Sequence, residues 1–136
     1  MVFETYNLDR LANWKEFRDT LETSETPLAD VVNLWSRAPI VNKYLDPYNY
    51  TSWPTPWELL VNGKFDDLAL VLGMSYTIKF TEKFKNSNIK ICLVSDQKEP
   101  IYFLIVDDTY VLNYEYRSIL SIDSIEDVNS SVLKQL

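Results

Sequence analysis

The sequence predicts an α+β fold in which helices come first along the chain and strands follow. Apolar residues recur at three- and four-residue steps up to about residue 84, which is the spacing of amphipathic helices. From residue 89 to residue 122 they alternate or form short continuous runs, which is typical of strands. Because the two patterns do not alternate along the chain, they favour segregated helices and strands over βαβ units.

The 136 residues, 46% of them hydrophobic, are enough for one domain with its own core. We expect a single domain over residues 1–136, made of a helical part (1–43), a core (44–122) and a short C-terminal helix or tail (123–136). The helix at the end is predicted from the helix-like spacing of four apolar residues: Ile125, Val128, Val132 and Leu133.

Two helices are predicted in the N-terminal part. The first covers residues 8–21, and its apolar face consists of Leu8, Leu11, Trp14, Phe17 and Leu21. The second begins at Pro27 with Thr26 as its N-cap, and Pro39 lies beyond its end.

Two further helices are predicted in the core. Thr55 and Pro56 open a short third helix, Glu58 completes a capping box with Thr55, and Gly63 ends the helix. The fourth helix is expected over residues 65–84. Its apolar residues lie on more than one face, so we expect it to be the central helix.

Residues 44–56 contain three prolines and are predicted to be irregular. Four aromatic residues within this segment, Tyr44, Tyr48, Tyr50 and Trp53, either pack on the core or form a contact surface. The solubility cost of exposed aromatic clusters favours packing. If they form a contact surface instead, its candidate binding residues are Tyr48, Tyr50, Trp53 and Trp57.

Three strands and a possible fourth are predicted after the central helix. In the first, over residues 89–95, Ile89, Ile91 and Leu93 are expected to face inward and Lys90, Cys92 and Val94 outward. The second, over 102–106, is continuously apolar and is expected to be buried on both faces. A turn at 107–109 leads into a third strand over 110–114, and residues 119–122 favour a short fourth.

The composition excludes several classes of chemistry. The chain has no histidine, which rules out a Ser-His-Asp triad, a Cys-His pair and imidazole ligands for a metal. Two glycines are too few for a P-loop or a dinucleotide fingerprint. One cysteine, Cys92, allows neither an internal disulfide nor a thiolate zinc site. We expect no cofactor and no metal.

The net charge of −7 disfavours binding to nucleic acid, whose phosphates are neutralised by Lys and Arg. The acidity indicates a basic partner, mimicry of nucleic acid, or solubility alone, and the scattered positions of the acids favour solubility. The start of the chain does not resemble a signal peptide, and no stretch of 18 apolar residues predicts a membrane span. These features, with one unpaired cysteine, favour a reducing cytoplasm and no membrane partner.

Two pairs of neighbouring acids could hold a divalent cation or act in acid–base catalysis: Asp66 with Asp67, and Asp107 with Asp108. The structural interpretation is favoured for both. The first pair stands at a predicted helix start, where negative charge is stabilising, and the second stands in a predicted turn.

Residues 53–60 (WPTPWELL) and 62–70 (NGKFDDLAL) resemble a stretch of the bacterial transglutaminase-like cysteine proteinases. That family has a tryptophan-x-threonine/serine-proline-x-glutamate segment, then a glycine-x-cysteine-acid-aspartate-x-alanine motif that opens the central helix. Residues 111–114 (VLNY) resemble its valine-leucine-aspartate-asparagine strand. The resemblance covers about residues 50–122 and implies a papain-like core, with a central helix packed on a small antiparallel sheet. The chain also resembles small uncharacterised proteins of T4-like bacteriophages.

The resemblance implies a site that has lost its chemistry. The family's nucleophilic cysteine corresponds to Phe65, its histidine to Ile101 or Tyr102, and its orienting residue to Asn113. Phe65 has no nucleophilic atom, so thiol catalysis at these degenerate positions is excluded and we expect no enzyme. Phe65 either fills the former cleft or forms the floor of a surviving groove, and filling is favoured. Cys92 lies in a predicted strand and is expected to be an inert, at least half-buried thiol.

The leading hypothesis is a catalytically inactive phage protein that binds a host or phage protein in the host cytoplasm. One alternative is a hydrolase or transferase that uses carboxylates or Tyr102 in a repurposed cleft. Another is a component of the virion or of its assembly.

Overall fold

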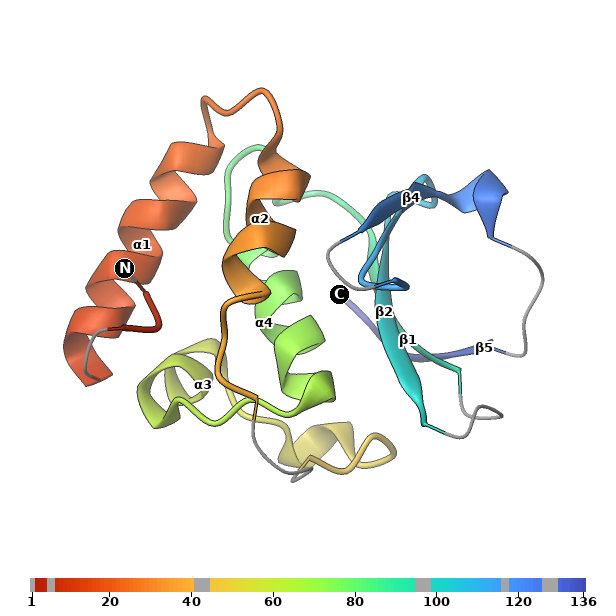
Figure 1. Ribbon diagram of the computed structural model, residues 1–136, viewed down its shortest axis with the longest axis horizontal. Helices are drawn as coiled ribbons and strands as arrows, with labels where there is room; N and C mark the ends of the chain where they lie inside the picture. Colours follow the sequence, from red (N-terminus) through yellow and green to blue (C-terminus); the bar gives the residue numbers. More distant parts are fainter. Residues whose placement is uncertain (1, 5–6, 41–44, 95–98, 116–117, 126–129) are drawn as a thin grey trace.

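The computed structural model describes residues 2–4, 7–40, 45–94, 99–115, 118–125 and 130–136, and separates helices from strands (Figure 1). Its helices are α1 (Asn7–Leu21), α2 (Pro27–Trp35), α3 (Pro56–Asn62) and α4 (Asp67–Lys79). Its strands are β1 (Ile89–Val94), β2 (Ile101–Val106), β3 (Tyr110–Leu112), β4 (Ile119–Ser121) and β5 (Ser130–Gln135). They form one antiparallel sheet in the order β4-β3-β2-β1-β5. The predicted α+β class is confirmed.

Helix α4 is the central helix, as predicted. It contacts α2 and α3 on one side and strands β1 and β2 on the other, so it lies between the other helices and the sheet in Figure 1. Every residue from Leu68 to Ser75 is buried. One turn further on, the Thr77 hydroxyl accepts hydrogen bonds from the indole nitrogens of Trp14 and Trp35, each at 2.9 Å. This hydroxyl therefore joins α1 and α2 to α4.

Helix α4 is shorter than the predicted span 65–84. It is capped by Asp66 and ends at Lys79, with Phe80 as its C-cap. The Thr81 hydroxyl donates to the carbonyl of Ile78 (2.8 Å). The carboxylate of Glu22 accepts the next backbone N–H groups, those of Glu82 (2.8 Å) and Lys83 (3.0 Å). These side chains take over the bonds that further helical turns would use.

The start and end signals of α3 are confirmed. The Thr55 hydroxyl accepts from the Glu58 backbone N–H at 3.2 Å, and the Glu58 carboxylate accepts from the Thr55 N–H at 3.0 Å. Gly63 ends the helix in the left-handed conformation (φ 66°). For α2 the predicted start at Pro27 and Thr26 as the N-cap residue are confirmed, but the Thr26 hydroxyl donates to Asp30 and accepts no backbone N–H.

The sheet buries both of its faces in part. One face of β1 packs on the main core, as predicted for Ile89, Ile91 and Leu93. The expectation that Cys92 and Val94 face outward is wrong, because they are buried in a second cluster on the other face with Phe103 and Val111. Residues of the segment after β4, including Ile122 and Ile125, pack against this cluster.

The predicted C-terminal helix is also wrong. Residues 130–135 form strand β5, which pairs antiparallel with β1. Val132 and Leu133 lie in this strand, whereas Val128 lies outside the described residues. An isolated helix of this length is marginal in water, and pairing with the free edge of β1 satisfies the backbone instead. No helix within the described parts of the chain has the length and apolar character needed to cross a membrane.

Candidate functional site

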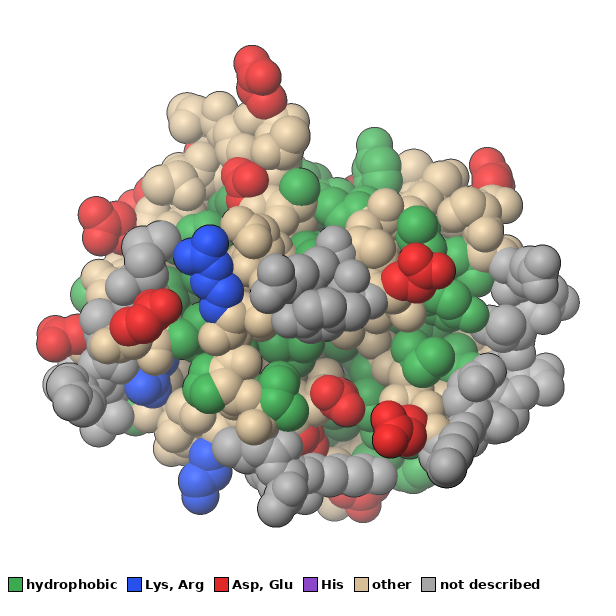
Figure 2. All heavy atoms as spheres, in the orientation of Figure 1, with side chains coloured by type: hydrophobic (Ala, Val, Ile, Leu, Met, Phe, Trp, Pro, Cys, Tyr) green, Lys and Arg blue, Asp and Glu red, His purple; other side chains and the backbone are tan. Residues whose placement is uncertain are grey.

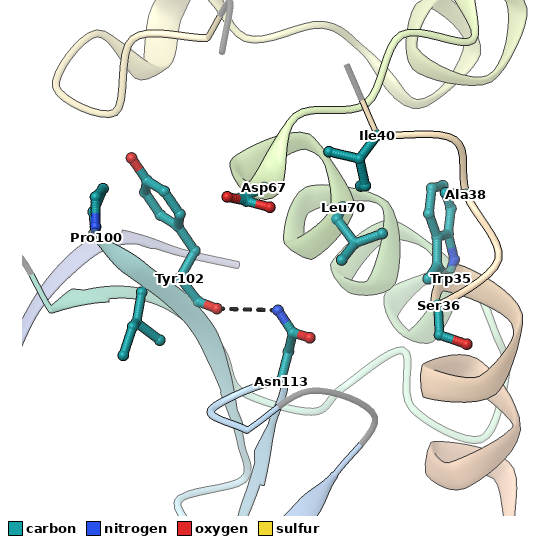
Figure 3. Close-up of a pocket in the computed structure, with 10 residues that line it drawn as sticks. Trp35, Ser36, Ala38, Ile40, Asp67, Leu70, Pro100, Tyr102 and Asn113 are labelled. Carbon is teal, nitrogen blue, oxygen red and sulfur yellow. Dashed lines mark hydrogen bonds between the residues drawn. The ribbon is translucent and has the colours of Figure 1, made fainter. Parts of the chain in front are cut away.

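A pocket of about 300 Å³ lies where the end of α2 and the start of α4 meet the sheet (Figure 3). Apolar side chains from the helical side, Trp35, Ala38, Ile40 and Leu70, form part of its lining. Its polar groups come from Ser36, Asp67, Tyr102 and Asn113. The pocket thus combines three parts of the chain that are far apart in sequence.

Two neighbouring carboxylates at the start of α4 have different roles. That of Asp66 is buried and caps the helix, and that of Asp67 lies at the pocket. Asp66 is 3% exposed. Its carboxylate accepts from the backbone N–H of Ala69 (2.8 Å), which caps the helix, and from that of Leu45 (3.0 Å). Asp67 is the first helical residue and is exposed. In Figure 3 its carboxylate faces Tyr102.

The sheet contributes Tyr102 and Asn113, which are joined by a hydrogen bond. The Asn113 side-chain nitrogen donates to the Tyr102 carbonyl at 3.2 Å (Figure 3). Asn113 follows β3 and has a φ of 69°, a left-handed conformation that asparagine adopts more readily than most residues. The Asn113 backbone N–H donates to the carbonyl of Ser118, which holds the turn between β3 and β4.

The surroundings of the pocket are acidic. Burial, and then the charges of Asp66 and Glu99, raise the pKa of Asp67. Burial also raises the pKa of Tyr102, and the nearby acids Asp66, Asp67 and Asp46 add to the effect, as does Tyr48. On the face shown in Figure 2, the visible Lys and Arg of the described residues lie over the helical side, whereas acidic side chains lie over both the helical side and the sheet side.

Phe65 does not line the pocket but is packed behind it. The Phe65 side chain is 1% exposed. Its ring makes edge contacts with Phe3 (centroids 5.4 Å apart) and with Trp35 (5.5 Å), and Trp35 is itself part of the pocket lining. Phe65 is therefore part of the core and does not form the floor of this pocket. That its ring fills a former cleft stays a prediction. Three of the positions considered from sequence, Ile101, Tyr102 and Asn113, do come together at the pocket.

Among the described aromatic residues of segment 44–56, Trp53 packs against the core as expected, whereas Tyr48 and Tyr50 do not. Tyr48 is 73% exposed and Tyr50 is 51% exposed, so the packing interpretation is wrong for them. The segment is held by its own contacts, because the Trp53 indole nitrogen donates to the Asp46 carbonyl (2.8 Å) and residues Tyr50–Ser52 form a 3₁₀ turn. Trp53 is half-buried, and Tyr44 lies outside the described residues.

Trp57 is separate from the pocket. It is 52% exposed and lies at the start of α3, where its ring contacts those of Trp14 (6.0 Å) and Phe80 (5.7 Å). Tyr50 instead packs beside Trp53 (6.5 Å) and under the ammonium group of Lys134 in β5 (4.5 Å). The four aromatic residues proposed from sequence therefore do not converge on one cavity.

The other reactive side chains are committed to structural roles. Cys92 is 1% exposed in β1, so the expected burial of this thiol is confirmed, and burial raises its pKa to about 11, which favours the unreactive, protonated form. Asp107 accepts from the Ser87 hydroxyl and the Asn88 N–H, each at 2.8 Å, and Asp108 pairs with Lys90 (2.9 Å). Both aspartates have a positive φ in the predicted turn, and among the described residues no group of three potential ligands forms a metal site.

Sequence reasoning missed much of the pocket. From sequence, Asp67 is considered only as one of an acid pair for which the helix-start role is favoured, and Trp35 is given no functional role. One feature of the local sequence does point to Asp67. It directly follows the N-cap residue Asp66, and only one of the two adjacent carboxylates is needed to cap the helix. Ile40 and Leu70 carry no local signal, because only the tertiary fold brings them to the same cavity.

A scan of the chain against family models finds no match, and searches among curated proteins and among solved structures find none either.

Proposed function

We propose that this chain is a catalytically inactive, transglutaminase-like protein of a T4-like bacteriophage that acts by binding a protein in the cytoplasm of the infected host. The partner is a host or phage protein rather than nucleic acid. The papain-like core is part of the proposal. It is supported by the order of the elements, in which a central helix that starts after Phe65 is followed by antiparallel strands packed on it.

The observation that carries the proposal is the placement of Phe65 next to an open pocket. A buried aromatic ring occupies the position before the central helix where the family has its cysteine. The neighbouring cavity, with Asp67, Tyr102 and Asn113, nevertheless remains accessible. A site without its nucleophile and without histidine, but with its cavity retained, supports binding rather than turnover.

The raised pKa of Asp67 favours one alternative, a hydrolase or transferase in which this carboxyl acts as a general acid. Among the described residues, however, neither the Asp67 carboxylate nor the Tyr102 hydroxyl is hydrogen-bonded to another side chain of the pocket. Turnover of ester or amide substrates that is abolished by both Asp67→Asn and Tyr102→Phe would establish this alternative.

Site-specific photo-crosslinking in infected cells tests the proposal. A benzophenone amino acid in place of Ile40, which is 54% exposed and lines the pocket, should give a discrete covalent adduct with one protein. The same probe at Thr23, an exposed position in the connection between α1 and α2, is the matched control. Absence of a protein adduct at Ile40, or an adduct with nucleic acid, would contradict the proposal. Abundant protein in purified particles would favour the virion alternative.

A further inference from the structure

The size of the pocket limits what it can hold. At about 300 Å³ it lies at the lower end of the range for ligand sites. Part of its wall is apolar, from Trp35, Ala38 and Leu70, and part is the ring of Tyr102. The Trp35 indole nitrogen already donates to Thr77, so Trp35 offers the pocket only its apolar surface. These dimensions fit one long side chain.

Asn113 and Tyr102 both offer the pocket an oxygen that can accept a hydrogen bond. The Asn113 side-chain nitrogen is used by the Tyr102 carbonyl, which leaves its oxygen as an acceptor. Tyr102 is 6% exposed, and its hydroxyl has no hydrogen bond within the described parts of the chain. The hydroxyl oxygen itself is not among the fully buried polar atoms, so it is open to a ligand that bonds to it.

Among the described residues, the charged side chains that line the pocket or act on its titratable groups have one sign. Asp67 lines it, and Asp46 and Glu99 are close enough to influence the pKa of Tyr102 or Asp67. None of the described lining residues is a lysine or an arginine. With Asp67 in its lining, the described part of the pocket therefore favours a cation over an anion.

We propose that the pocket binds the side chain of an arginine in a basic segment of the partner protein. The inference rests on the proposed function and names the group that the site recognises. The guanidinium group carries five donors in one plane, which suits a carboxylate (Asp67), an amide oxygen (Asn113) and a phenol oxygen (Tyr102). It also packs well on aromatic rings, whereas an ammonium group is compact and more strongly hydrated. Phosphate groups are excluded by the same carboxylates.

The test is a titration of the full-length, ¹⁵N-labelled chain with three blocked peptides that differ only in a central residue between glycines. The central residue is arginine, lysine or citrulline, and citrulline keeps the shape of arginine without its charge. Peptide is added to about 10 mM, which is sufficient to detect a Kd near 1 mM. We expect saturable shifts at the Asn113 side-chain amide and the Trp35 indole N–H with the arginine peptide. Binding should weaken about tenfold with citrulline and should fall with added salt.

Two variants locate the interaction. Asp67→Asn should lower the affinity for the arginine peptide about tenfold, because it removes the charge that faces Tyr102. Glu25→Gln removes an equal charge from an exposed position before α2 and should leave the affinity unchanged. The ¹⁵N spectrum of each free variant shows whether it is folded. Asn113→Gly, which keeps the turn and removes the acceptor oxygen, provides a second pocket variant.

The outcomes separate this inference from the proposed function. Equal binding of the citrulline peptide, a preference for lysine, shifts away from the pocket, or no binding at all would each overturn the arginine site. A discrete crosslinked protein at Ile40 would still support the proposed function in those cases. Conversely, arginine binding without any crosslinked protein in the cell would leave the pocket specific for arginine but would contradict the proposed biological role.

Discussion

The backbone of Gly73 in α4 lies directly against the indole ring of Trp35 in α2. A Cβ atom added at Gly73 would come within 2.2 Å of Trp35 Cη2 and 2.4 Å of Cζ3. Both residues are in the buried core, where Trp35 is 0% exposed. Only a residue without a side chain allows α2 and α4 to approach this closely, so the contact determines the position of the ring that also lines the pocket.

We therefore expect Gly73→Ala to destabilise the protein by about 1–3 kcal/mol, because it overpacks the core. At an open helical position the same change would stabilise by up to about 1 kcal/mol. Urea unfolding measures the difference. Trp35→Phe removes the ring atoms that the new Cβ would meet, so the loss caused by Gly73→Ala should be smaller in the Trp35→Phe background. Additive losses in this double-mutant cycle would contradict the explanation.

Thr77→Val should be much more destabilising than Thr77→Ser. Valine has the shape of threonine but no hydroxyl, so the indole nitrogens of Trp14 and Trp35 would both lose their acceptor in a buried environment. Each unpaired donor costs about 1–3 kcal/mol. Serine keeps the acceptor and loses only a methyl group, worth about 1 kcal/mol. Equal free energies of unfolding for the two variants would show that the shared hydroxyl contributes little.

Features that depend on neighbouring residues could be predicted from the sequence. The capping box of Thr55 and Glu58, the helix end at Gly63 and the turn at Asp107 each depend on a few consecutive residues, and each is present in the structure. The central helix was predicted from its apolar residues on several faces, because such a helix must be covered on several sides.

Features that depend on distant residues could not be predicted in this way. The end of α4 is set by the Glu22 carboxylate, 60 residues earlier in the chain, and the C-terminal segment becomes a strand because β1 offers it a free edge. The pocket is equally non-local, since Trp35, Asp67 and Tyr102 come from three separate segments. From sequence, the resemblance indicates Ile101, Tyr102 and Asn113, the acid pair draws attention to Asp67, and residues such as Ile40 and Leu70 carry no signal.

Asp66→Ala should be destabilising by about 2 kcal/mol or more, because the buried carboxylate bonds both the Ala69 and the Leu45 backbone N–H groups. Loss of the cap costs about 1 kcal/mol, and the second unpaired donor adds to it. Amide hydrogen exchange should show faster exchange at Leu45 and Ala69. Asp67→Asn is the matched control, because it removes an equal charge from the next residue, and it should cost less than 1 kcal/mol.

At position 113, glycine should be better tolerated than alanine. The φ of 69° places Asn113 in the left-handed region, where a Cβ atom costs about 1–2 kcal/mol and glycine has no such penalty. Thermal unfolding should therefore rank Asn113→Gly as more stable than Asn113→Ala. Both variants lose the hydrogen bond to the Tyr102 carbonyl, so the difference in their stability reports the cost of a Cβ atom in the left-handed backbone conformation. An equal or reversed order would indicate that the turn relaxes to another conformation.

The Cys92 thiol should make stability depend on pH in the alkaline range. Burial raises its pKa from 9.0 to about 11, so between these values the folded state retains a proton that the unfolded state has lost. The folded state therefore has its full stability below about pH 9 and loses stability as the pH rises towards 11. The difference between the two pKa values corresponds to at most about 3 kcal/mol of stability, and screening by solvent reduces it.

Because tyrosines and lysines also titrate in this pH range, the measurement is the difference in unfolding free energy between wild type and Cys92→Ala at each pH. The two should converge as the pH rises from 9 to 11. A constant difference, or rapid alkylation of the folded wild type at pH 8, would show that the thiol is more accessible than its position in β1 implies.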